Sequence, residues 1–99
     1  MLTVNYYIKL ILKKKKWTNT KLCHEINKIE VQLGDKKTTP QNITNYLNGY
    51  WTFGPKLLVK YEKALGLEEG TLIKMVPKPS TKAGKQELKD LIEKVREVK

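Results

Sequence analysis

The sequence predicts an all-α fold for this chain of 99 residues. Apolar residues recur at i, i+3, i+4 and i+7 in several segments, which is the spacing of one face of an amphipathic helix. No segment alternates apolar and polar residues for long enough to predict a strand. Gly34, Gly49 and Gly66 each follow an apolar stripe, where glycine commonly ends a helix in a left-handed conformation. We therefore expect one helical domain with a modest core.

Two amphipathic helices are predicted in the first third of the chain. Residues 4–14 carry an apolar stripe and run into four consecutive lysines, whose charge suits a helix C-terminus. Thr18 or Asn19 can cap the second helix, since both side chains accept hydrogen bonds from free backbone N–H groups. The second stripe continues to Leu33, and Gly34 is expected to end that helix.

A short third helix is predicted over residues 39–48, a segment that contains no charged side chain. Thr39 is a good N-cap, and Pro40 suits the first helical position because its missing N–H would have no partner there. Ile43 and Leu47 lie four residues apart and mark the apolar face of this helix. Three amide side chains are therefore expected on its other faces: Gln41, Asn42 and Asn45.

A fourth and a fifth helix are predicted to complete the core. Pro55 suits the first position of the fourth helix, and Gly66 follows its last apolar residue. Residues 68–75 contain further apolar side chains and predict a short fifth helix packed back on the core. Residues 1–76 are therefore expected to form one domain.

The C-terminal part of the chain differs from this domain in composition. Residues 77–84 are rich in proline, lysine, serine and glycine, which is typical of a linker. Residues 85–99 place apolar side chains at heptad-like spacing and predict an amphipathic helix. Such a helix is too short to be stable alone in water. It must dock on its own domain, pair with a second copy or stay partly unfolded, and the sequence leaves these alternatives open.

The charge of the chain favours a polyanionic partner. Twenty Lys and Arg residues against ten Asp and Glu residues give this basic protein a formal net charge of +10. Nucleic acid is the first expectation and an anionic membrane surface the second. No uncharged apolar run approaches the roughly 20 residues of a membrane span. The N-terminal segment also lacks the basic region of a signal peptide.

The titratable side chains assemble no catalytic pattern in the sequence. There is no nucleophile accompanied by a histidine and an orienting carboxylate, no glycine-rich phosphate loop and no carboxylate cluster for Mg²⁺. His24 has no second histidine or cysteine at metal-ligand spacing, and Cys23 is expected in the core. We therefore expect a protein that is not an enzyme and uses no metal or cofactor. A single cysteine excludes an intrachain disulfide and favours the reducing cytoplasm.

Three motifs follow one another along the chain: Thr18-Asn19-Thr20-Lys21-Leu22-Cys23, Ile43-Thr44-Asn45-Tyr46-Leu47-Asn48-Gly49 and Lys63-Ala64-Leu65-Gly66-Leu67. They resemble, in this order, the start of helix two, the end of the recognition helix and the end of helix four in the helix-turn-helix domain of the lambda repressor and Cro class. This class contains phage and plasmid transcriptional regulators. The resemblance covers residues 4–75 and implies a five-helix, lambda-repressor-like DNA-binding domain, with the C-terminal helix outside it.

One departure from the family pattern concerns the connection between helices two and three. Fifteen residues separate Cys23 from Thr39, against about six in the family. The excess must lengthen helix two, the turn or both. A tight turn sets the angle between the two helices, so the longer connection leaves the presentation of the third helix undetermined. The extension also adds Lys28, Lys36 and Lys37.

The resemblance and the chemistry of amides together predict the DNA contacts. Asn and Gln make paired hydrogen bonds to adenine in the major groove, whereas arginine, which pairs with guanine, is absent from residues 1–95. Base contacts are therefore expected from Gln41, Asn42 and Asn45, in an operator rich in A·T pairs. The resemblance implies backbone contacts by Asn19, Thr39, Thr44, Trp51 and Thr52. The lysines expected to join them at the backbone are Lys36, Lys37 and Lys56.

These expectations describe a sequence-specific regulator of transcription, a repressor, that binds double-stranded DNA with helix 39–48 in the major groove. Such regulators bind as homodimers to two half-sites, and residues 85–99 are the candidate dimerisation helix. One alternative is a protein-interaction module that uses the same fold to bind a polymerase, nuclease or toxin partner. Another is a non-specific binder that stacks single-stranded bases on the aromatic side chains of residues 50–53.

Overall fold

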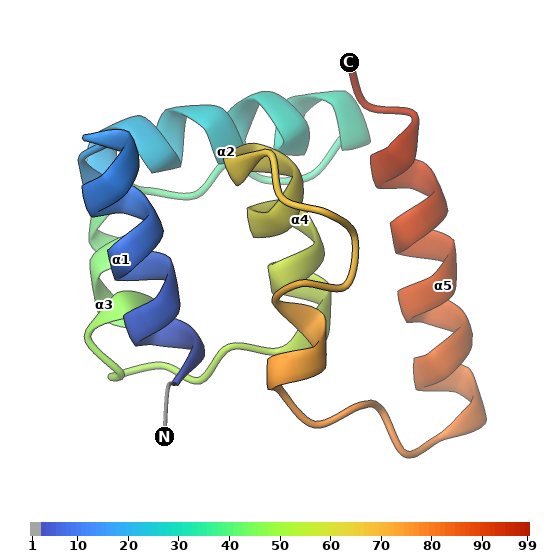
Figure 1. The fold of residues 1–99 in the computed structure, drawn as a ribbon. Coiled ribbons are helices and arrows are strands. Elements are labelled where there is room, and N and C mark those ends of the chain that lie inside the picture. Colours follow the sequence, from blue (N-terminus) through green and yellow to red (C-terminus); the bar gives the residue numbers. More distant parts are fainter. Residues whose placement is uncertain (1–2) are drawn as a thin grey trace.

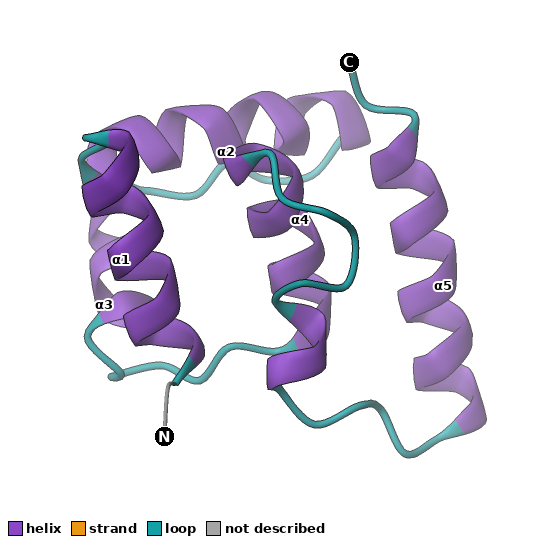
Figure 2. Ribbon diagram, viewed as in Figure 1, coloured by secondary structure: helices purple, strands orange, loops and turns teal. Residues whose placement is uncertain are grey.

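The computed structural model describes residues 3–99, and this range contains five α-helices, one 3₁₀ turn and no β-strand (Figure 1; Figure 2). The predicted all-α class is therefore confirmed for this range. The elements have these bounds: α1 Val4–Lys15, α2 Asn19–Leu33, α3 Pro40–Leu47, α4 Pro55–Leu65, η1 Ile73–Met75 and α5 Lys82–Arg96. The long connection expected before α3 is divided between a four-turn α2 and an irregular segment of residues 34–39.

Threonine side chains start four of the five α-helices. Thr3, Thr18, Thr39 and Thr81 each have an extended backbone, and each hydroxyl accepts a hydrogen bond from the N–H three residues further on. These bonds satisfy N–H groups that have no partner inside the helix. The caps predicted at Thr18 and Thr39 are confirmed. Thr81 starts α5 at Lys82, so the helix includes the last three residues of the segment predicted to be a linker.

The predicted left-handed helix ends are also confirmed. Gly34, Gly49 and Gly66 have φ values of 75°, 83° and 70°. At Gly49 this conformation lets the N–H of Tyr50 donate to the carbonyl of Asn45 at 2.9 Å, which satisfies one of the free carbonyls at the end of α3. Lys16 ends α1 with a φ of 60°, a conformation that a side chain makes less favourable.

The core lies between α1, α2, α3 and α4. Each contributes an aliphatic side chain that is at most 1% exposed: Ile8, Leu22, Ile43 and Leu58. Cys23 joins this core, as the sequence predicts. Burial raises the pKa of the Cys23 thiol, and a hydrogen bond from Asn27 offsets part of that effect.

The predicted fifth helix over residues 68–75 is wrong, because only Ile73–Met75 forms a single 3₁₀ turn there. Gly70 interrupts the segment with a φ of 94°. The buried carboxylate of Glu62 on α4 then takes the place of helical carbonyls as hydrogen-bond acceptor. It accepts from the backbone N–H groups of Gly70 at 2.9 Å, Leu72 at 2.6 Å and Ile73 at 3.0 Å. One side chain therefore organises a segment that has no regular helix of its own.

The C-terminal helix α5 packs against α4 and the end of α2 (Figure 1). Val95 of α5 and Val98 just after it are buried, and Leu88, Leu91 and Ile92 of α5 are half-buried against the core. The radius of gyration is 12.9 Å, close to the value of about 13 Å expected for a 100-residue domain. Of the three alternatives that the sequence left open for this helix, docking is the one present in the single chain.

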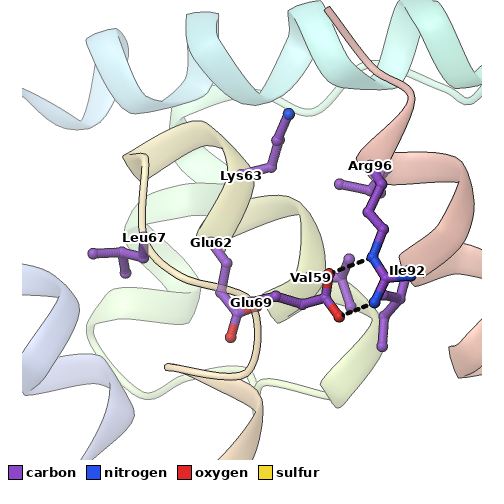
Figure 3. Close-up of a pocket in the computed structure, with 8 residues that line it drawn as sticks. Val59, Glu62, Lys63, Leu67, Glu69, Ile92 and Arg96 are labelled. Carbon is purple, nitrogen blue, oxygen red and sulfur yellow. Dashed lines mark hydrogen bonds and ion pairs between the residues drawn. The ribbon is translucent and has the colours of Figure 1, made fainter.

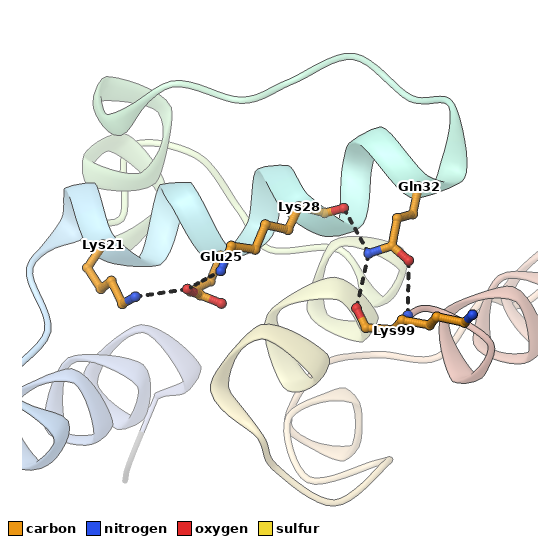
Figure 4. A network of polar contacts seen from close by, with 5 residues as sticks. All are labelled: Lys21, Glu25, Lys28, Gln32 and Lys99. Atoms are coloured by element: carbon orange, nitrogen blue, oxygen red, sulfur yellow. Dashed lines mark hydrogen bonds and ion pairs between the residues drawn. The ribbon is translucent and has the colours of Figure 1, made fainter.

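Polar contacts hold the C-terminal end of α5 in place. The guanidinium of Arg96 donates to both carboxylate oxygens of Glu69, at 2.7 and 2.6 Å. Gln32 on α2 makes two hydrogen bonds to the backbone of Lys99, with its amide donating at 3.1 Å and accepting at 3.0 Å (Figure 4). These contacts join α5 to two separate parts of the domain.

Candidate nucleic-acid interface

The predicted base-contacting residues lie on the solvent side of α3. Ile43 and Leu47 are 1% and 3% exposed and attach α3 to the core. Gln41 is exposed, whereas Asn42 and Asn45 are half-buried. This arrangement follows from the helical spacing of the two apolar residues, as the sequence analysis expected.

Gln41 and Asn45 form a pair on the surface of α3. The amide Nε2 of Gln41 donates to Oδ1 of Asn45 at 3.1 Å, one helical turn away. Neither Oε1 of Gln41 nor Nδ2 of Asn45 has a hydrogen-bond partner within residues 3–99. The pair therefore presents one acceptor and one donor to solvent, which is the combination that the major-groove edge of adenine requires.

Asn27 on α2 makes the main contacts that hold the end of the segment between α2 and α3, and Sγ of Cys23 adds a weak hydrogen bond to the carbonyl of Thr38 at 3.5 Å. Oδ1 of Asn27 accepts the N–H of Thr38 at 2.8 Å, and Nδ2 of Asn27 donates to the carbonyl of Thr38 at 3.0 Å. The same amide nitrogen contacts Sγ of Cys23 at 3.5 Å. These bonds place Thr38 next to the middle of α2 and so set the direction in which α3 begins. Asn27 is not among the residues predicted from the sequence. It lies one turn after the core residue Cys23, and this spacing places its amide on the inward side of α2.

Asn19 and Thr44, both predicted to contact the DNA backbone, contact each other in the free chain. Nδ2 of Asn19 donates to the Thr44 hydroxyl at 3.1 Å, and that hydroxyl donates to the carbonyl of Pro40 at 3.0 Å. The proton of the Thr44 hydroxyl is therefore already in use, whereas Asn19 keeps a second amide N–H. The contact joins the start of α2 to the middle of α3, so both residues help to position α3.

Lysines lie at both ends of α3. Lys36 and Lys37 are exposed in the segment before it, and neither makes an ion pair within residues 3–99. At the other end, Nζ of Lys9 on α1 donates to Oδ1 of Asn48 at 3.3 Å. Lys9 was not among the predicted residues. Lys56 is exposed as well, but it forms an ion pair with Glu87 of α5.

A second group of cations surrounds the junction of α1 and α2. Nζ of Lys15 and Nζ of Lys21 lie 5.2 and 5.4 Å from the ring centroid of Trp17, within the range of a cation–π contact. Lys21 and Lys28 also share the carboxylate of Glu25, and their hydrogen bonds lower the pKa of that group (Figure 4). The junction is therefore a basic surface near the start of α2.

The aromatic residues after α3 pack mainly on one another. Tyr46 contacts Trp51 edge-on at 5.2 Å and Phe53 in a stacked arrangement at 5.1 Å, and Phe53 meets Tyr61 edge-on at 5.1 Å. Trp51 remains 44% exposed and Tyr50 77% exposed. Trp51 and its neighbour Thr52, which is also exposed, keep surface on which a nucleic-acid backbone could lie.

An ion-pair network attaches the end of α2 to α4. Nζ of Lys60 lies 2.7 Å from Glu30 and 3.2 Å from Asp35. Burial opposes the charge of Lys60, but the hydrogen bonds and charges of the two carboxylates outweigh burial and raise its pKa above the ordinary value. The extension of α2 is therefore part of the folded core region.

No protein-family model matches this chain, and no similar curated protein or solved structure was found for it. Within residues 3–99, no cluster of histidine, cysteine, aspartate or glutamate is arranged to hold a metal ion. None of the helices in that range has the length and apolar character to cross a membrane.

Proposed function

We propose that this protein is a sequence-specific regulator of transcription, a repressor, that binds double-stranded DNA with α3 in the major groove. The observation that supports this most directly is the uncharged outer face of α3, where Gln41 and Asn45 present an acceptor and a donor. Exposed lysines lie before and after this face. Amides can read bases while lysines neutralise phosphates, so the two kinds of contact are divided between different residues.

The proposed mechanism is occupation of an operator. Gln41, Asn42 and Asn45 would contact base edges, and the free N–H groups at the start of α3, next to Thr39, would face a phosphate. Lys36 and Lys37 would hold the phosphates on one side, with Trp51 and Thr52 along the other. Bound in this way, the protein would exclude other proteins from the same DNA.

The proposed operator is rich in A·T pairs, because the side chains on α3 suit adenine. Arg96, the one arginine of the chain, lies on α5 and bonds to Glu69, and α4 separates α5 from α3 (Figure 1). Two copies would bind paired half-sites. The buried part of the apolar stripe of α5, at Val95, packs against its own domain and would not be free to join the two copies.

The test is a selection of bound sequences from a random duplex pool at about 150 mM salt, where purely electrostatic binding is weak. The proposal expects an A·T-rich motif, recovered as two half-sites about one helical turn apart. The double variant Gln41→Ala/Asn45→Ala should lose the motif while it keeps its salt-dependent attraction to DNA. A wild-type pool without enrichment, or a motif built on G·C triplets, would reject the proposal.

A further inference from the structure

A groove runs along α5, between this helix and the chain that follows α4. It consists of two adjoining hollows of about 230 and 550 Å³, and both are lined by Glu69, Ile92 and Arg96. Figure 3 shows the residues that line the first of them. Apolar side chains from α4, from the segment after it and from α5 line the groove: Val59, Leu67, Pro79, Leu88, Ile92 and Val95. An apolar floor is thus continuous between the two hollows.

The rim of the groove is basic. Lys63, Lys78, Lys85 and Lys89 line it, and none of the four makes an ion pair within residues 3–99. Glu93 is the one rim carboxylate in that range without a hydrogen-bond or ion partner. Four unpaired ammonium groups therefore face a single unpaired carboxylate, so the rim attracts acidic groups.

The chain itself shows that the groove accepts a carboxylate. Glu69 reaches from the segment after α4 to Arg96 on α5 and receives two parallel hydrogen bonds, at 2.6 and 2.7 Å (Figure 3). A paired arrangement of this kind is specific for planar anions such as carboxylates. Ile92 and Val95 line the same hollow as this pair and supply apolar surface to it.

We propose that this groove binds an acidic amphipathic segment of a partner protein. Such a segment, folded as a helix, would insert apolar side chains into the two hollows and direct its carboxylates to the rim lysines. The groove is open to solvent along its length, so a helical segment would cover more of it than a small ligand. The inference does not depend on DNA binding by α3.

The position of the groove separates it from the proposed DNA surface. Figure 1 shows α4 between α5 and the pair formed by α1 and α3, so α5 and α3 lie on different sides of the molecule. A nucleic-acid backbone could bind the rim lysines, but it would gain nothing from the apolar floor. The combination of floor and rim favours an acidic polypeptide and leaves α3 free.

The test uses the full chain and two fluorescent peptides of about 16 residues made of leucine, glutamate and alanine. One peptide has leucines at i, i+3, i+4 and i+7, and the other has the same composition in an order without a stripe. The striped peptide should bind, and Lys85→Glu/Lys89→Glu should weaken its binding about tenfold, as expected for loss and reversal of two exposed charges. Amide chemical shifts of Leu88, Ile92 and Val95 should move on binding.

The matched control is Lys82→Glu/Lys94→Glu, which makes the same change of net charge on exposed residues of α5 outside the groove. It should bind the striped peptide within about twofold of the wild type. Equal binding of the two peptides, or equal weakening by the two double variants, would overturn the proposal. It would also be overturned if Lys85→Glu/Lys89→Glu weakened binding of a mixed-sequence DNA duplex more than binding of the striped peptide. Circular dichroism should show that both variants remain folded.

Discussion

At the scale of residues, single amide side chains define the region around α3. Asn27 makes both hydrogen bonds that a backbone unit can make, to the N–H and the carbonyl of Thr38. It thereby replaces the tight turn that a shorter connection would provide. Gln41 and Asn45 then supply the exposed polar groups on the helix that this contact positions.

Replacement of Asn27 by alanine should lower the free energy of unfolding by about 2 kcal/mol, because the half-buried N–H of Thr38 loses its partner and the carbonyl of Thr38 keeps only the weak contact with Sγ of Cys23. Urea denaturation measures this change. The control Gln86→Ala removes an exposed amide from α5 and should change stability by less than about 0.5 kcal/mol. A similarly small effect of both changes would show that Asn27 does not hold the connection.

Replacement of Gln41 by alanine should relax sequence preference at one base pair by about 1–3 kcal/mol and leave stability nearly unchanged. Gln86→Ala is the matched control, because Gln86 also donates to a side-chain oxygen one turn further on. Binding to a selected operator and to its single-base variants measures the effect. Unaltered discrimination by the Gln41 variant would exclude this side chain from base contact.

At the scale of elements, α2 and α4 pack on each other, α3 packs on α2, and α5 packs on both α2 and α4. Lys60 on α4 bonds to Glu30 near the end of α2 and to Asp35 just after it. The lengthened α2 is thereby held at its far end, and the segment leading to α3 starts from a fixed point. The sequence predicts a longer connection between the second and third helices, but no pattern near Glu30 or Asp35 predicts their contact with Lys60 on α4.

Stability should decrease at alkaline pH as Lys60 loses its proton. The pKa of Lys60 is raised in the folded protein, whereas a lysine in the unfolded chain has a pKa of about 10.4. The contribution of Lys60 is therefore complete below that pH and is lost as pH rises through the folded pKa. The destabilisation caused by Lys60→Met, measured by urea denaturation, should be constant between about pH 8 and 10 and shrink above.

Lys63→Met is the control for this experiment, because Lys63 is exposed on the same helix and makes no ion pair within residues 3–99. Its effect on stability should stay small at every pH. If the effect of Lys60→Met also stayed constant up to pH 11, the network would not be the source of the alkaline loss.

At the scale of the whole molecule, α5 closes one side of the domain. Its apolar stripe covers α4 and the end of α2, with Val95 and Val98 fully inside. The sequence places this helix behind a linker and leaves open whether it docks on its own domain, pairs with a second copy or stays partly unfolded. In the single chain it belongs to the same compact body, and its outer edge forms the groove proposed to bind an acidic partner.

Deletion of residues 77–99 should therefore destabilise the domain instead of leaving it unaffected. The deletion uncovers apolar surface on α4, and loss of the Val95 and Val98 contacts alone should lower the free energy of unfolding by about 3 kcal/mol. Thermal denaturation followed by circular dichroism measures the loss. An unchanged midpoint would mean that α5 contributes nothing by docking in solution.

Local signals made most of the helices predictable. Thr18, Thr39 and Gly49 act on backbone groups within five residues of themselves, so their roles can be recognised from the sequence. The outward positions of Gln41, which is exposed, and of Asn45, which is half-buried, follow from the helical spacing of their apolar neighbours. The function assigned to those positions stays a prediction.

Contacts between distant residues decided the rest. Asn27 bonds to Thr38, and Glu62 accepts hydrogen bonds from the backbone N–H groups of residues 70, 72 and 73 where a helix was expected. The helix α5 covers α4 from the other end of the chain. Each depends on which surfaces meet after folding, and a local pattern carries no information about its partner. Helices and caps were therefore determined by the sequence itself, since their hydrogen bonds close within a few residues. Contacts between separate elements determined the direction of α3, the absence of a regular helix over residues 68–75 and the docking of α5.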